Sequence, residues 1–253
     1  MLADYHIHAA AHGEYKYTRE WIQQFLDTAA GRGIAEIGLS EHLEYSELVD
    51  WALIEKISSE AKQVKVRLGL EADYIPGQEE ITRKHIMARN YDYIIGSVHF
   101  INGWGFDHPD FREQFDYCDI DETYQLYFDL VLGMVQSGLY DIVGHMDLIK
   151  LWGHRPRRPI SSFITPVLKA IRVAGMTVEL NSAGLRKPVH ELYPAENIIT
   201  EMFNLDIPVT LGSDAHHPDQ VGEDFDILVK AAARAGYNCI MTFAQRCPGK
   251  VLI

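Results

Sequence analysis

Strand-like and helix-like segments alternate along nearly the whole 253-residue chain. Short apolar runs predict strands, and amphipathic runs with a helical period predict the helices between them. The predicted strands cover residues 4–8, 34–40, 64–70, 93–98, 140–144, 176–180 and 207–211. This alternation is typical of a parallel sheet with helical crossovers. The chain contains no repeats and no linker-like runs, so we expect one α/β domain over residues 1–253.

The predicted helices cover residues 18–30, 47–63, 77–90, 121–136, 161–174, 195–203 and 224–235. Thr18 is the expected N-cap of the first helix. The apolar stripe of the second helix is expected to consist of Leu48, Trp51, Ile54 and Ile57. Residues 100–118 are predicted to form a long irregular loop, and a last apolar stretch lies near residues 239–243.

Residue types that bind metals stand at the carboxyl ends of six of the seven predicted strands. They are His6, His8, His42, Glu71, His99, His145, Asp214 and His216. In a barrel of parallel strands these ends share one face, where active sites are built. With His12 in the loop after the first strand, the set exceeds what one zinc ion takes from protein. We therefore expect two or three divalent ions; the alternative is a set of polar residues that cap the barrel rim.

The spacing of His6 and His8 supports this interpretation, because side chains two apart on a strand point to the same face. Asp4 is expected to orient a histidine, or alternatively to cap the strand end. The other histidines lack strand-exit positions and are not expected to be ligands. They are His85, His108, His154, His190 and His217.

Charge and composition narrow the possible partners. A net charge of −13 disfavours nucleic acid, because phosphate contacts along a strand need clustered Lys and Arg. No apolar run is long enough to span a bilayer, and the N-terminus carries no signal pattern. Cys118, Cys239 and Cys247 are odd in number and are expected to be reduced. We expect a cytoplasmic protein with a small-molecule partner, and the oligomeric state stays open.

The strand-exit motifs resemble those of the PHP (polymerase and histidinol phosphatase) superfamily. The motifs are Asp-x-His-x-His at 4–8, Ser-Glu-His at 40–42, Gly-Leu-Glu at 69–71, Gly-Ser-Val-His at 96–99, Gly-His at 144–145 and Gly-Ser-Asp-Ala-His at 212–216. Residues 96–107 are more similar to stand-alone histidinol-phosphate phosphatases than to the polymerase-associated branch. The resemblance runs through essentially the whole chain. It implies a distorted (β/α)7 barrel, similar to a TIM barrel, with a metal site at the C-terminal ends of the strands.

The resemblance also implies a trinuclear site of zinc, manganese or iron. It assigns the first metal to His6, His8, Glu71 and Asp214, the second to Glu71, His99 and His145, and the third to His12, His42 and His216. Glu71 would therefore bridge two metals. Two basic side chains would bind the substrate phosphate, and Lys150 and Arg186 stand at the corresponding positions. The alternative for Lys150 is a solvated loop lysine.

We therefore expect a metal-dependent phosphomonoesterase in which a metal-activated hydroxide attacks phosphorus in line with the ester bond. Asp214 or His216 would deliver a proton to the leaving group, and the sequence does not decide between them. The resemblance favours L-histidinol phosphate, a substrate of histidine biosynthesis. Acids in the rim loops could pair with its amine or imidazole: Glu14, Glu41, Glu44, Asp73 and Asp107. The alternatives are a phosphatase of another small phosphomonoester, a nuclease or phosphodiesterase, and an inert metal-binding module.

Overall fold

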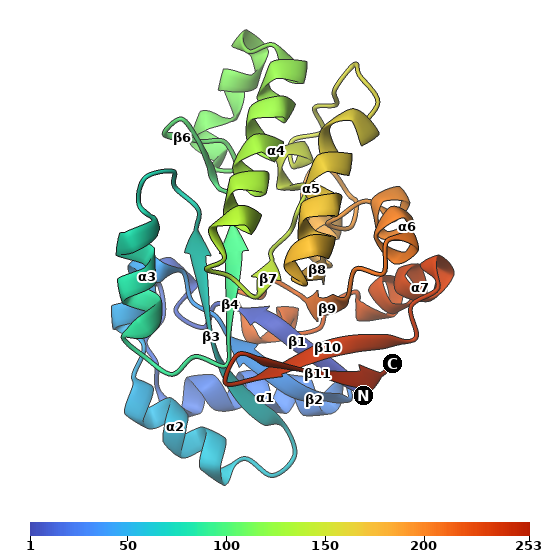
Figure 1. The fold of residues 1–253 in the computed structure, drawn as a ribbon. Helices are drawn as coiled ribbons and strands as arrows, with labels where there is room; N and C mark the ends of the chain where they lie inside the picture. The colour runs from blue at the N-terminus through green and yellow to red at the C-terminus, as the bar shows by residue number, and fades with distance from the viewer.

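A computed structural model describes residues 1–253 and contains a sheet of seven parallel strands (Figure 1). In spatial order these are β1 (Leu2–Ile7), β2 (Ile34–Leu39), β3 (Lys65–Asp73), β4 (Tyr93–Ser97), β7 (Ile142–Val143), β8 (Thr177–Asn181) and β9 (Val209–Gly212). Every neighbouring pair is parallel. These are the seven strands expected from the sequence, with small differences at their ends.

The sheet curves until its first strand meets the segment that follows its last strand. Ile7 forms a parallel bridge with Ala215. The backbone N–H of His8 donates to the Ala215 carbonyl at 2.8 Å, and the N–H of Ala215 donates to the His6 carbonyl at 3.1 Å. The predicted distorted (β/α)7 barrel is confirmed, and its seam lies between two segments that carry predicted ligands.

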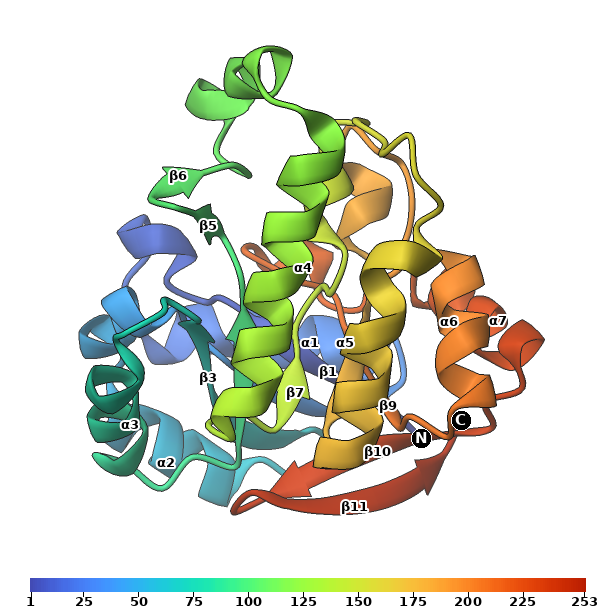
Figure 2. The same ribbon diagram turned by 45° about the horizontal axis from the view of Figure 1, so that its top comes forward.

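Helices separate consecutive strands and cover the outside of the barrel. They are α1 (Arg19–Gly31), α2 (Trp51–Glu60), α3 (Glu79–Met87), α4 (Ile120–Ser137), α5 (Ser161–Ala174), α6 (Glu196–Asn204) and α7 (Phe225–Ala235). The two longest, α4 and α5, pack side by side (Figure 2). Thr18 caps α1 as predicted, because its side chain accepts a hydrogen bond from the N–H of Trp21 at 3.2 Å.

Two local predictions were wrong. The second helix begins at Trp51, where Asp50 caps it by accepting the N–H of Leu53. Leu48 therefore lies in a preceding 3-10 turn and is 50% exposed, so it does not face the core. Residues 100–118 are more regular than expected. They contain the hairpin strands β5 (Phe100–Ile101) and β6 (Trp104–Gly105), followed by a 3-10 helix, Pro109–Tyr117.

The interior of the barrel is closely packed around Tyr93, the first residue of β4. Tyr93 is fully buried, and its hydroxyl donates to the Tyr5 carbonyl at 2.6 Å. Glycines on the adjoining strands make room for this ring: a Cβ at Gly38 would lie 1.8 Å from the Tyr93 hydroxyl, and one at Gly69 would lie 2.3 Å from its ring. The buried apolar residues form one connected core of 68 members, and one domain over residues 1–253 stays our prediction.

A C-terminal hairpin covers the end of the barrel where the strands begin. It consists of β10 (Cys239–Ala244), near the predicted apolar stretch, and β11 (Cys247–Leu252), which was not expected (Figure 1). Its turn is held at the start of β4, since the N–H groups of Gln245 and Arg246 donate to Asp92. The opposite face, where the strands end, is therefore the one left for chemistry. None of the helices combines the length and apolarity needed to cross a bilayer.

Candidate metal centre

Glu71, in the last part of β3, lies at the middle of the predicted ligands and is 1% exposed. Its Oε2 atom faces three imidazoles: Nε2 of His6 at 3.2 Å, Nε2 of His8 at 3.3 Å and Nδ1 of His42 at 3.0 Å. Its Oε1 atom faces the other side of the cluster, with His145 Nε2 at 3.1 Å and His99 Nε2 at 3.8 Å. The two oxygens of one carboxylate thus point toward two groups of histidines, as a bridging ligand requires.

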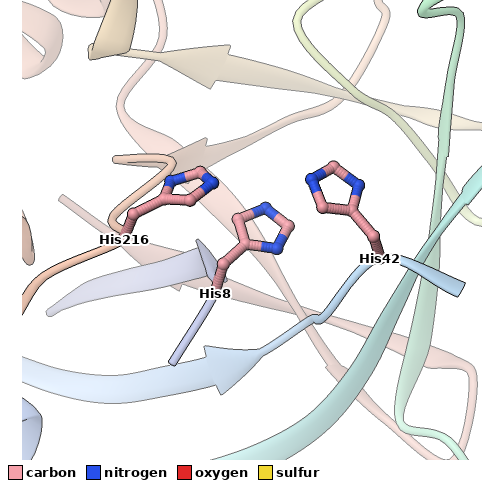
Figure 3. A group of neighbouring side chains, drawn as sticks. All are labelled: His8, His42 and His216. Carbon is pink, nitrogen blue, oxygen red and sulfur yellow. The ribbon is translucent and has the colours of Figure 1, made fainter. Parts of the chain in front are cut away.

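Figure 3 shows three histidines that come from distant parts of the chain, with their rings close together. His8 follows directly on β1, His42 follows β2, and His216 follows β9. The centre of the His8 ring lies 4.3 Å from the centre of the His42 ring and 4.6 Å from that of the His216 ring. The barrel seam therefore brings the first and last predicted ligand segments into contact.

Asp214 completes the seam on the C-terminal side. Its Oδ1 atom lies 3.4 Å from His8 Nε2 and 3.9 Å from His6 Nε2. The backbone of Asp214 adopts a left-handed conformation with φ of 54°, which turns the chain sharply after β9. Two hydrogen bonds to the Asp4 carboxylate fix this turn. The N–H of Ser213 donates at 2.9 Å and its hydroxyl at 2.5 Å.

Eight of the nine predicted ligands fall into four overlapping groups whose candidate ligand atoms lie within 4.8 Å of one another. The groups are His8, His42 and His216; His6, His8 and Glu71; His6, His145 and Asp214; and His42, Glu71 and His99. His12 belongs to none of them. Its exposed ring lies beside those of His42 and His216, with centres 5.2 and 4.7 Å away. The third predicted trio therefore differs from the observed one by a single histidine, His8 in place of His12.

The chemistry of this donor set fits divalent cations. Several buried atoms have no hydrogen-bond partner in the protein: His6 Nε2, His8 Nε2, Glu71 Oε2, His145 Nδ1 and His216 Nε2. Buried polar atoms without partners cost free energy, so their concentration at one place needs an explanation. Imidazole nitrogens and carboxylate oxygens are ordinary ligands of zinc, manganese and iron.

The carboxylates and histidines also shift one another's pKa values. Burial lowers the pKa of His8, but the carboxylates of Asp214 and Glu71, at 3.4 and 3.3 Å from its Nε2 atom, outweigh this and raise it to about 9. Burial favours the neutral form of Glu71, yet the charges of His6 and His42 hold its pKa well below the usual range. A cation that binds to His8 below a pH of about 9 would therefore have to displace a proton.

A second layer of carboxylates holds the imidazoles from behind. Glu179 on β8 lies 2.7 Å from His6 Nδ1, and Asp73 at the end of β3 lies 2.7 Å from His99 Nδ1. Such contacts fix which ring nitrogen carries the proton and leave the other for a metal. Ser97 supports Glu71 in the same way, since its hydroxyl donates to Glu71 Oε1 at 2.5 Å.

The sequence did not identify the orienting carboxylates correctly. The Asp4 carboxylate accepts hydrogen bonds from Ser213, from the backbone of Gly222 and from the backbone N–H of His6 at 3.3 Å, but none from a histidine ring. Glu179 was missed. The available signal was a charged residue between two apolar residues, Val178 and Leu180, in the middle of a strand, where it has to be buried.

Comparison with known proteins agrees with this geometry. The model of the family described as "PHP domain" matches residues 4–183. The chain belongs to the PHP domain family. A Deinococcus radiodurans protein named "Probable histidinol-phosphatase" is 35% identical over 97% of this chain and 97% of its own length. The Bacillus subtilis protein named "Histidinol-phosphatase" is 28% identical over 90% of this chain and 98% of its own length.

A solved structure has the same fold. The crystal structure of histidinol phosphate phosphatase from Lactococcus lactis, complexed with zinc, L-histidinol and phosphate, superimposes with a TM-score of 0.81. The two chains are 18% identical, and the match covers 98% of each. The arrangement of strands and helices is therefore shared across nearly the whole length of both chains.

In this PHP domain a cavity of about 120 Å³ opens over the ligand cluster. Seven predicted ligands line it: His12, His42, Glu71, His99, His145, Asp214 and His216. The rest of the lining includes Asp107, Lys187 and Tyr193. One acidic and one basic side chain therefore stand beside the candidate metal ligands.

Neither basic side chain that we assigned to phosphate lies in this lining. The buried Lys150 donates to the Leu192 carbonyl at 2.6 Å, lies 2.7 Å from Asp147 Oδ2 and lines a neighbouring cavity. Arg186 donates to the Ser213 carbonyl at 2.6 Å and lies 3.3 Å from Glu223. Their contact with a substrate phosphate stays a prediction, whereas Lys187 lines the cavity itself.

Proposed function

We propose that this PHP protein is a metal-dependent phosphomonoesterase that hydrolyses L-histidinol phosphate to L-histidinol and phosphate. The observation that carries the proposal is the position of Glu71, whose two oxygens face separate groups of histidines. A site with bridging carboxylate and histidine ligands suits two or more cations, and clustered cations suit a phosphate dianion. The choice of L-histidinol phosphate as the substrate rests on the near-full-length relatives that are named as histidinol-phosphatases.

The hydrolysis transfers the phosphoryl group from the substrate alcohol to water. Bound divalent ions would supply Lewis acidity and an activated water. The bond between phosphorus and the ester oxygen breaks as the bond to the water oxygen forms, and a proton reaches the departing alkoxide. Asp214 and His216, which line the cavity next to each other, are our candidates for moving that proton.

The cavity lining offers partners for both ends of the proposed substrate. Lys187 is a basic side chain that can pair with a phosphoryl oxygen, and Asp107 is an acid that can pair with an amine or a protonated imidazole. A net charge of −13 supports a small-molecule substrate over a nucleic acid.

Cys118, Cys239 and Cys247 form no disulfide, which supports our proposal of a cytoplasmic location.

The decisive experiment measures phosphate release from L-histidinol phosphate by zinc- or manganese-loaded protein, beside a panel of other phosphomonoesters and a dinucleotide. We expect strong preference for histidinol phosphate, lost after chelation or in His99→Ala. His85→Ala is the matched control, because His85 lies exposed on α3, away from the cluster. Equal turnover of the whole panel would reject the substrate, and cleavage of the dinucleotide alone would favour a nuclease.

A further inference from the structure

Tyr193 carries the one tyrosine hydroxyl of this chain that is buried without a hydrogen-bond partner. Its side chain is 1% exposed and lines the cavity over the metal ligands. Other buried tyrosine hydroxyls donate to a carbonyl or carboxylate oxygen of the protein, in Tyr5, Tyr17, Tyr93, Tyr124, Tyr127, Tyr140 and Tyr237. A donor left unpaired in a low-dielectric site costs free energy, so Tyr193 is the exception that requires a reason.

The backbone holds Tyr193 at the end of β8. Tyr193 and Asn181 exchange two hydrogen bonds, with N···O distances of 2.6 and 3.0 Å. Gly184 leaves room for the same segment, since a Cβ there would lie 2.0 Å from the Glu191 carbonyl oxygen and 3.0 Å from two carbon atoms of the Tyr193 ring. The hydroxyl therefore occupies a defined position before any substrate arrives, which is the condition for electrostatic catalysis without reorganisation.

Lys150 holds the segment that carries this ring. Its ammonium lies 5.3 Å from the centre of the Tyr193 ring and donates to the carbonyl of the preceding residue, Leu192. Asp147 Oδ2 anchors the ammonium at 2.7 Å, and all three groups are buried. The lysine is thus engaged by these partners and lines a neighbouring cavity, not the one over the metal ligands.

The direction of the hydrogen bond follows from the surroundings of the hydroxyl. Burial raises the pKa of Tyr193 well above its ordinary value. The negative charges of Asp147, Asp214 and Asp107 raise this pKa further. The phenol is therefore a neutral donor at any ordinary assay pH. A donor with no acceptor in the protein, on a residue that lines a cavity with metal ligands, suits an anionic oxygen of the ligand that this cavity receives.

We propose that Tyr193 is a further catalytic residue, whose hydroxyl donates a hydrogen bond to a non-bridging oxygen of the substrate phosphate. The proposal rests on the proposed phosphomonoesterase function. Negative charge on these oxygens is redistributed in the transition state, and a fixed donor at that place stabilises it. Tyr193 forms no covalent bond and transfers no proton in this role.

The test compares Tyr193→Phe with the wild type, both fully metal-loaded. We expect kcat/KM for L-histidinol phosphate to fall about 10- to 100-fold, and the Kd for inorganic phosphate, measured by calorimetry, to rise by a similar factor. Metal content and Tm should stay close to those of the wild type. Tyr237→Phe is the matched control: it removes a buried hydroxyl that donates to the Ile207 carbonyl, far from the cavity, and should change neither kinetic nor binding constant.

Three results would overturn the proposal: unchanged kcat/KM, a fall in kcat/KM with unchanged phosphate affinity, or a loss of activity that follows loss of metal. The second would place the hydroxyl at the leaving group, and the third would make it structural. If the wild type hydrolysed no phosphomonoester, the proposed function would be refuted. The phosphate affinities of the wild type and of Tyr193→Phe would still decide whether Tyr193 binds phosphate. Absence of phosphate binding by the wild type would refute both.

Discussion

Glu179 lies behind His6, with its Oε1 atom 2.7 Å from His6 Nδ1. Its other oxygen accepts the backbone N–H of His145 at 2.8 Å. One buried carboxylate on β8 therefore positions two candidate ligands that come from β1 and from the end of β7. Because Nδ1 of His6 is engaged by Glu179, its Nε2 atom is presented to Glu71 and to a cation.

Glu179→Gln should weaken metal binding. The glutamine can still accept a hydrogen bond from His6, but its NH₂ group would face the N–H of His145, so one of the two contacts becomes repulsive. We expect metal affinity to fall about 10- to 100-fold, as for other residues that orient metal ligands. Metal content after dialysis against a graded chelator measures this.

Glu36→Gln is the control for the effect of removing a buried glutamate charge. Glu36 is 3% exposed and pairs with Tyr5 and Arg67, away from the candidate ligands. This variant should lower Tm and keep its metals. Equal metal retention by Glu179→Gln and the wild type would contradict the orienting role.

Gly212→Ala should disrupt the contact between Glu179 and His6 by steric clash. A Cβ at this position would lie 1.8 Å from Glu179 Oε1 and 2.8 Å from the Cβ of His6, so both side chains would have to move. We expect lower Tm and lower metal content together. Gly31→Ala, where the added methyl meets nothing within 4 Å, should be neutral or slightly stabilising.

Lys150→Met separates a structural role of this lysine from a role in binding phosphate. It removes the partner of the buried Asp147 carboxylate, so we expect a destabilisation of about 3–5 kcal/mol in chemical denaturation. Lys169→Met, at an exposed position of α5, should leave the stability unchanged. A raised KM with unchanged stability would instead support direct contact of Lys150 with the substrate phosphate.

Metal binding to the chelated protein should release protons near neutral pH. The carboxylates raise the pKa of His8 to about 9, so below that pH a proton competes with the cation for its nitrogen. Apparent zinc affinity should therefore rise with pH up to this value and fall on acidification. Calorimetric titrations in two buffers of different ionisation enthalpy count the protons; equal heats in both buffers would argue against the proton-loaded cluster.

The sequence was sufficient for the framework because strand periodicity and strand exits are local signals. His6 and His8 fall on one face by alternation alone, and parallel strands bring Glu71 and His99 to the same end of the barrel. Periodicity does not reveal how far a side chain reaches across the interior. The contact of Glu179 with His6 joins residues 173 positions apart, and no local pattern encodes it.

Loop geometry was the second limit. The position of His12 depends on a left-handed backbone conformation, φ of 59°, in the loop after β1. Leu48 matched a helical stripe, but Asp50 offered a better helix start and left it outside. The sequence left Lys150 either on the substrate phosphate or in solvent, because the burial of its ammonium depends partly on a distant acceptor, the Leu192 carbonyl, as well as on the nearby Asp147.

The seam between Ile7 and Ala215 has a consequence for how the protein is made. Cations held across it would cross-link segments that are roughly 200 residues apart, and long loops are those whose closure costs most entropy. A nascent chain presents His6 and His8 roughly 200 residues before their partners Asp214 and His216. The complete set of candidate ligands exists only after Asp214 and His216 have been synthesised, so we expect metals to bind late and to hold the seam of a barrel that has already formed.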